Sequence, residues 1–220
     1  MSSMTLGPGE PAAGPWQVEA LDDFARSLAG PAPRIIAVDG RGGSGKTVLA
    51  ERLRRLLTPA AVVHSDDVAW AHSRFGWDDL MIDGILEPVR AGRGAHYRPT
   101  GWIKDGREGH LDVPADATTL ILEGVGVSRR SLVPLLDVAV WVQSDYIEAR
   151  ERGVRRDIAE LGRTEEDGQR LWQEWEDEEV PFLIDDRPWE RADVIVATAS
   201  SVPYDRETEV AVVRPPRPLR

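Results

Sequence analysis

Residues 40–47 combine glycines, a lysine and a threonine at a spacing that suits phosphate chemistry. They follow the pattern G-x-x-x-x-G-K-[ST], between an apolar run and a segment with helical spacing. Glycines let the backbone turn sharply and offer N–H groups to phosphate oxygens, and a helix N-terminus adds positive charge. The lysine suits β- and γ-phosphates, and the threonine hydroxyl suits Mg²⁺. We therefore predict a site for ATP and Mg²⁺ that contains Gly40, Gly42, Gly43, Ser44, Gly45, Lys46, Thr47 and Val48. The alternative is a glycine-rich turn with a surface lysine.

Three carboxylates follow apolar runs that lie downstream of this loop. Asp66 and Asp67 come directly after "VVHS", and Glu123 ends "LILE". The carboxyl ends of strands beside a phosphate loop are where open α/β sheets bind ligands. A carboxylate there can orient an acceptor hydroxyl, take its proton or hold Mg²⁺ through water. The alternatives are a helix N-cap pair for the two aspartates and an exposed strand end for the glutamate.

A cluster of arginines stands out in this acidic chain. Within 150–163 lie Arg150, Arg152, Arg155, Arg156 and Arg163. Arginines that close over a transferring phosphate stabilise the charge of the transition state and exclude water. Arg152 and Arg156 share a helix face and are the preferred pair for such a lid, followed by Arg163. The alternative is a solvated helix whose arginines pair with acids at helical spacing.

Aromatic and histidine side chains gather between the aspartates and Glu123. The segment 66–110 holds Trp70, Trp77, Trp102, Tyr97, His72, His96 and His110. Aromatic faces beside polar groups suit a flat or sugar-like acceptor, and we expect this segment to bind it. Asp66, Asp67 and Trp102 are candidates for that contact. The alternative for Trp77 and Trp102 is packing in the core.

The elements that must position these residues alternate along the chain. Continuous apolar runs at 34–38, 60–65, 118–124, 137–143 and 192–198 are typical of strands buried on both faces. Between and after them, helical patterns are found at 45–57, 78–91, 144–161 (with Ser144 as the N-cap) and 165–180. This alternation predicts an α/β three-layer sandwich with about five parallel strands.

Composition sets limits on partners and location. The 220 residues carry a formal net charge of -11 and no cysteine, which argues against a duplex nucleic-acid binder and against disulfides. No apolar run is long enough to span a membrane, and the N-terminus lacks the pattern of a signal peptide. We expect a cytoplasmic protein with a small-molecule acceptor, without nucleic-acid or membrane partners; the sequence leaves a homodimer open.

In six motifs, from about residue 34 to residue 197, the chain resembles the uridine kinase-like family of P-loop kinases. These motifs are "DGRGGSGKT", "HSDD", "LEPVRAGRGAHYRPTGW", "LILEGVG", "RGVRRDIAELGR" and "RADVIV". The resemblance implies that Asp66 is a catalytic base and that Glu123 lies near the metal. It also implies an arginine lid, and "HYRPTGW" makes Tyr97 and Arg98 acceptor candidates. The chain departs from the family at Gly153 and Leu161, where lid arginines would be expected.

These patterns and the resemblance predict a kinase. We expect ATP-dependent phosphoryl transfer to a hydroxyl of a small molecule, with a nucleoside or a sugar-like alcohol among the candidates. The alternative is a P-loop regulatory protein or ATPase that has no small acceptor. The expected boundaries are a flexible tail (1–14), a kinase domain (15–202) with acceptor part 66–110 and lid 150–164, and a C-terminal extension (203–220).

Overall fold

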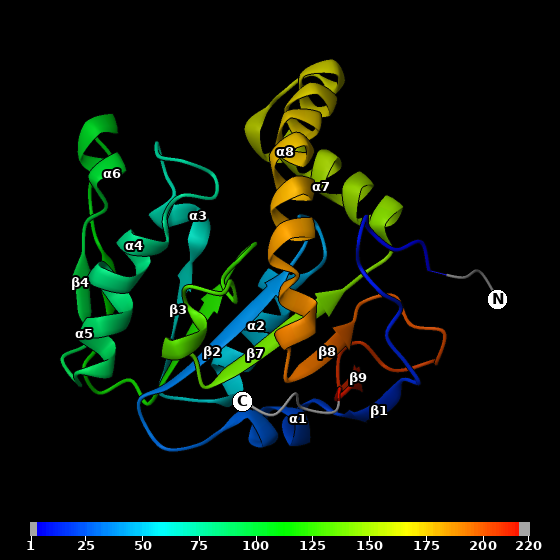
Figure 1. Ribbon diagram of the computed structural model, residues 1–220, viewed down its shortest axis with the longest axis horizontal. Helices are drawn as coiled ribbons and strands as arrows, with labels where there is room; N and C mark the ends of the chain where they lie inside the picture. Colours follow the sequence, from blue (N-terminus) through cyan, green and yellow to red (C-terminus); the bar gives the residue numbers. More distant parts are fainter. Residues whose placement is uncertain (1–3, 216–220) are drawn as a thin grey trace.

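The core of the protein is a seven-stranded sheet in which five neighbouring strands are parallel (Figure 1). The computed structural model describes residues 4–215, except for the side chains of residues 160 and 161. In spatial order the strands are β1 (Gln17–Ala20), β9 (Glu209–Val213), β8 (Val194–Ala197), β7 (Val138–Gln143), β2 (Arg34–Gly40), β6 (Thr119–Glu123) and β3 (Ala60–His64). The strands from β8 to β3 are parallel. Strand β9 pairs antiparallel with β8, and β1 pairs antiparallel with β9 at the edge of the sheet.

Helices and short helical turns occupy much of the chain between the strands. They are α1 (Leu21–Leu28), α2 (Lys46–Leu56), α3 (Ser65–Val68), α4 (Asp78–Met81), the π-helical turn η1 (Ile82–Leu86), α5 (Glu87–Arg90), α6 (Thr100–Asp105), η2 (Val133–Leu135), α7 (Tyr146–Leu161), α8 (Glu165–Asp186) and η3 (Pro188–Arg191). A small hairpin of β4 (Ala95–Tyr97) and β5 (Leu111–Val113) lies in the expected acceptor part. None of the helices within residues 4–215 has the length and apolar character needed to cross a membrane.

The sheet is covered on both faces, and its central strands β2, β6 and β7 are buried at every position except Arg34. On β2, Ile36 and Val38 pack with α1 and α2, while Ile35 and Ala37 pack on the opposite face with Trp77 and the helical segment 78–90. A third cluster beneath α8 contains Trp141 and Leu183. Helices above and below one sheet make the three-layer α/β sandwich that the sequence predicts, and its five parallel strands are confirmed.

Several boundaries differ from the expectations. Helix α7 begins at Tyr146 and its N-cap is Asp145, whose side chain accepts from the Glu148 N–H; Ser144 is not the cap. Helix α8 continues past residue 180 to Asp186, because residues beyond that point, such as Leu183, are buried. The strands β1 and β9 were not predicted from the sequence. They are short, and neither flanks the phosphate loop.

The two terminal segments take part in the fold. Glu10, inside the expected flexible tail 1–14, is buried and accepts hydrogen bonds from Trp141 Nε1 (2.6 Å) and Gln143 Nε2 (2.9 Å). Glu10 thus ties this segment to the sheet, and the flexibility of the tail 1–14 stays a prediction. Strand β9 lies in the expected C-terminal extension 203–220. Residues 1–3 of the predicted tail and residues 216–220 of the predicted extension lie outside the described part of the chain.

Candidate active site

The predicted phosphate loop joins the end of β2 to the start of α2. Gly43 in this loop has a φ of 69°, and a Cβ atom on it would lie 2.1 Å from the carbonyl oxygen of Ala149 in α7. Glycine is therefore required for both its backbone angle and its lack of volume. Lys46 is buried at the start of α2, and its Nζ donates to the carbonyl of Arg41 (2.9 Å). The loop has the strand–loop–helix setting that the motif requires.

Other loop positions fill different roles. Gly40 has a φ of 153°, and Gly45, with a φ of 98°, is the N-cap of α2. Ser44 is buried, and its hydroxyl has no hydrogen-bond partner among the described residues. Val48 is 65% exposed and lies outside the cavity lining. Its predicted contact with the nucleotide remains a prediction.

The two aspartates of the "SDD" stretch separate in the structure. Both belong to the single turn α3 that follows β3. Asp66 lines the cavity beside Lys46, whereas Asp67 forms an ion pair with Arg107 (2.8 Å) and does not line it. Burial raises the pKa of Asp66, against the opposing charge of Lys46. Of the two, Asp66 is placed to meet a ligand in the cavity.

Glu123 is reached from two directions by polar groups. Strands β3 and β6 pair in parallel with His64 opposite Glu123, and His64 Nδ1 lies 2.6 Å from Glu123 Oε2. Burial alone would raise the pKa of Glu123, but the hydrogen bonds to His64 and Thr47 and the charge of Lys46 outweigh burial and lower it. A carboxylate kept ionised beside a threonine hydroxyl is a hard oxygen pair of the kind that Mg²⁺ prefers. His64 was missed in the sequence, although it directly precedes "SDD" at the end of an apolar run.

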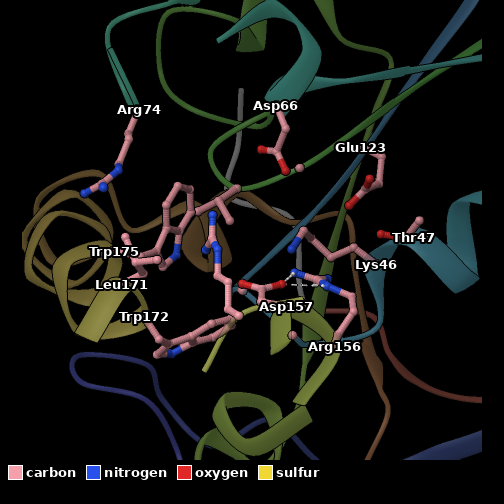
Figure 2. A pocket seen from close by; sticks show the side chains of 15 residues that line it. Lys46, Thr47, Asp66, Arg74, Glu123, Arg156, Asp157, Leu171, Trp172 and Trp175 are labelled. Carbon is pink, nitrogen blue, oxygen red and sulfur yellow. Dashed lines mark hydrogen bonds and ion pairs between the residues drawn. The ribbon is translucent and has the colours of Figure 1, made fainter. Parts of the chain in front are cut away.

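These groups face a common cavity of about 330 Å³ (Figure 2). Its lining consists of Gly42, Gly43, Lys46, Thr47, Asp66, Arg74, Glu123, Gly124, Val125, Arg156, Asp157, Arg163, Leu171, Trp172 and Trp175. The phosphate loop and the start of α2, the turn α3, the end of β6 and the helices α7 and α8 all contribute. The carboxylates and Lys46 point toward one another across it in Figure 2.

The arginine segment is divided between the cavity and its surroundings. Arg156 and Arg163 line the cavity, and Arg156 is held by Asp157 (2.8 Å). Arg152, the other member of the predicted pair, is outside the lining and donates to the Gly43 carbonyl (3.1 Å). Arg155 pairs with Glu151 on the exposed side of α7, as the alternative of a solvated helix predicts for it.

Three of the residues predicted to bind the acceptor, Tyr97, Arg98 and Trp102, lie elsewhere. Tyr97 packs over Gly84, Arg98 donates to the Arg107 carbonyl (2.9 Å), and the indole of Trp102 donates to the Asp67 carbonyl (2.8 Å). None of these three side chains lines the cavity. Trp102 and Trp77 are buried in the core, in agreement with the packing alternative.

Residues not singled out from the sequence form this side of the cavity instead. Arg74 reaches it from the loop after α3 and is tied to α8 through the Glu174 carbonyl (2.8 Å) and Glu178 (2.5 Å). Trp172 and Trp175 approach from α8 (Figure 2). No local pattern marks them, because Arg74 and the part of α8 that it contacts are 100 residues apart in the sequence and meet only in the folded chain.

Two curated proteins are similar in sequence to part of this chain. No family model matches the chain. It is 29% identical over 148 residues to uridine-cytidine kinase A of Dictyostelium discoideum, covering 60% of this chain and 30% of that protein. It is 28% identical over 144 residues to inorganic pyrophosphatase TTM2 of Arabidopsis thaliana, covering 60% and 21%. The matches thus span less than a third of the length of these curated relatives.

Two solved structures are also similar to the chain. A possible uridine kinase from Bacillus stearothermophilus matches 80% of this chain and 96% of its own, at 19% identity and a TM-score of 0.48. The protein TT1252 from Thermus thermophilus matches 77% and 91%, at 18% identity and a TM-score of 0.40. The sequence similarity to uridine-cytidine kinase A, together with the motifs and the order of the strands, confirms the predicted resemblance to the uridine kinase-like family of P-loop kinases.

Proposed function

We propose that this protein transfers the terminal phosphoryl group of ATP to a hydroxyl of a small molecule. The observation that carries the proposal is that one cavity brings Lys46 and Thr47 of the phosphate loop together with the carboxylate of Asp66. A triphosphate held at the loop and an acceptor held at Asp66 would meet within this space. Juxtaposing two reactants in this way removes much of the entropic barrier to their reaction.

The loop side of the cavity suits the triphosphate. Lys46 provides a buried positive charge for the phosphates, and Thr47 with Glu123 provides oxygen ligands for Mg²⁺. When bound, Mg²⁺ would neutralise charge on the phosphate oxygens. The hydrogen bond to His64 keeps Glu123 ionised and oriented for that task.

On the acceptor side, Asp66 is the proposed general base. Its carboxylate takes the proton of the acceptor hydroxyl as the hydroxyl oxygen bonds to the γ-phosphorus, and the bond from that phosphorus to the β-phosphate oxygen breaks. Arg156 and Arg163 stabilise the charge on the moving phosphoryl group. The indoles of Trp172 and Trp175 offer apolar surface for the body of a nucleoside or sugar-like alcohol.

The proposal is tested by measuring acceptor-dependent ADP release. Wild-type protein is mixed with Mg·ATP and a panel of nucleosides, sugars and vitamin precursors. With the acceptor that raises ADP release, Asp66→Asn should lower turnover by about 10²- to 10⁴-fold, the usual loss for a general base. Asp67→Asn is the matched control, since Asp67 pairs with Arg107 outside the cavity.

Calorimetry separates binding from transfer. Asp66→Asn should still bind ATP, whereas Lys46→Ala should lose most of that affinity. ATP binding without stimulation by any acceptor would favour the regulatory ATPase. Mild, equal effects of the two aspartate substitutions would remove Asp66 from its proposed role.

A further inference from the structure

A buried glutamate from α8 touches the phosphate loop. Glu179 is 2% exposed, and its Oε1 accepts the backbone N–H of Gly42 at 2.7 Å. The N–H of Gly42, predicted from the motif to be available for phosphate, is therefore already engaged. A side chain on Gly42 would crowd Trp172 and Trp175, which stand at 3.2–3.4 Å from the position of its Cβ. Loop and helix are packed together at this point.

The bond to Glu179 determines the orientation of one peptide group. The N–H of Gly42 and the carbonyl of Arg41 belong to the same planar unit, and in a trans peptide they point in opposite directions. That carbonyl accepts from Lys46 Nζ at 2.9 Å. Rotation of this peptide would break both bonds. The carboxylate of Glu179 is thus linked, through one rigid peptide, to the ammonium group of the phosphate-binding lysine.

The charge of Glu179 has a partner that does not face the cavity. Arg41 Nη1 lies 3.9 Å from Glu179 Oε2, and Arg41 Nε donates to Glu10 at 3.2 Å. Arg41 is 3% exposed, and its guanidinium also donates to the Pro8 carbonyl (2.7 Å). Burial raises the pKa of Glu179, against the Gly42 hydrogen bond and the charges of Arg41 and Lys46. Arg41 and its two acids therefore form a buried layer behind the loop.

We infer that Glu179 is a positioning residue for phosphate binding, which orients the Arg41–Gly42 peptide and through it Lys46. This inference rests on the proposed binding of ATP at the loop. Glu179 does not line the cavity, so it acts through the peptide and not by contact with substrate. Helix α8 also carries Trp172 and Trp175. The same helix therefore lines the proposed acceptor side of the cavity and positions the phosphate loop on the ATP side.

The chain offers a matched control for this inference in Glu10. Both glutamates are buried against Arg41, but only Glu179 bonds to the loop backbone. Calorimetry measures the affinity of each variant for a non-hydrolysable ATP analogue in the presence of Mg²⁺. Glu179→Ala should weaken binding by about tenfold or more, the size of a lost hydrogen bond to a charged acceptor. Glu179→Gln, which keeps an acceptor oxygen, should recover most of the affinity. Glu10→Ala should lower thermal stability but leave the affinity within about threefold.

The outcomes of these binding measurements test the inference. Unchanged affinity in folded Glu179→Ala, or an equal loss in Glu10→Ala, would overturn the inference. If Glu179→Ala does not fold, the same affinity is measured in Glu179→Asp, whose shorter side chain draws the carboxylate back from the Gly42 N–H. A loss of affinity in Glu179→Asp supports the inference, and an unchanged affinity contradicts it. Absence of analogue binding by the wild-type protein would instead refute the proposed function, on which the inference depends.

Discussion

Gly153 of α7 and Trp172 of α8 fit together only because residue 153 has no side chain. A Cβ atom at position 153 would lie 2.0 Å from ring carbons of Trp172. Uridine kinase-like sequences led us to expect an arginine at this position, and here an indole fills the space between the two helices. The same indole lines the cavity. Where a lid arginine was expected, glycine thus makes room for Trp172, which forms part of the cavity wall.

Replacing Gly153 with alanine should therefore destabilise the protein. In an exposed helix this change would stabilise by up to about 1 kcal/mol, but here overpacking against a buried ring should cost about 1–3 kcal/mol. Chemical denaturation measures the difference. A second substitution, Trp172→Leu, should remove the penalty of Gly153→Ala, because the smaller side chain makes room for the methyl group. A stabilised Gly153→Ala would contradict the packing described here.

The two neighbouring arginines of α7 should behave differently in catalysis. Arg156 lines the cavity, whereas Arg155 pairs with Glu151 away from it. Arg156→Ala should lower turnover by about 10²-fold, the usual effect of removing one group that stabilises transition-state charge. Arg155→Ala should leave turnover nearly unchanged. Both should alter stability by no more than about 0.5 kcal/mol, as exposed substitutions usually do. A collapse of stability in Arg156→Ala, with normal turnover of the folded fraction, would make Arg156 structural.

The N-cap of α7 gives a prediction that depends on pH. Burial alone would raise the pKa of Asp145, but hydrogen bonds from the N–H groups of Glu148 and Thr5 outweigh burial and lower it. A carboxylate with a lowered pKa stabilises the fold above the pKa of the unfolded chain, and this stabilisation is lost as pH falls through the folded pKa. Asp145→Ala should cost about 1 kcal/mol at neutral pH.

Denaturation of Asp145→Ala at several pH values checks this. Its deficit relative to wild type should shrink as the solution is acidified below the ordinary aspartate pKa of 3.8. Ser144→Ala is the control, since Ser144 does not cap the helix. A larger loss of stability in Ser144→Ala than in Asp145→Ala would indicate that Ser144 is the N-cap, as the sequence predicts.

The sequence alone was sufficient to predict the phosphate loop and the five parallel strands. The glycine spacing around Lys46 and the continuous apolar runs each reflect what a short stretch of chain requires, a tight turn in one case and burial in the other. Both can therefore be recognised without knowing the fold. The same reasoning located Asp66 and Glu123 at strand ends, and the sheet brings them to one edge.

Tertiary structure decided which side chains meet in the cavity. Asp66 and Asp67 are adjacent in sequence, and only the packing of α3, with Arg107 beside Asp67, separates their directions. His64 faces Glu123 through strand register, and Trp172, Trp175 and Glu179 reach the loop from a helix more than a hundred residues away. Such contacts depend on how distant elements pack together. The free energy of that packing comes from apolar surface buried between the elements, which a short sequence motif does not reveal.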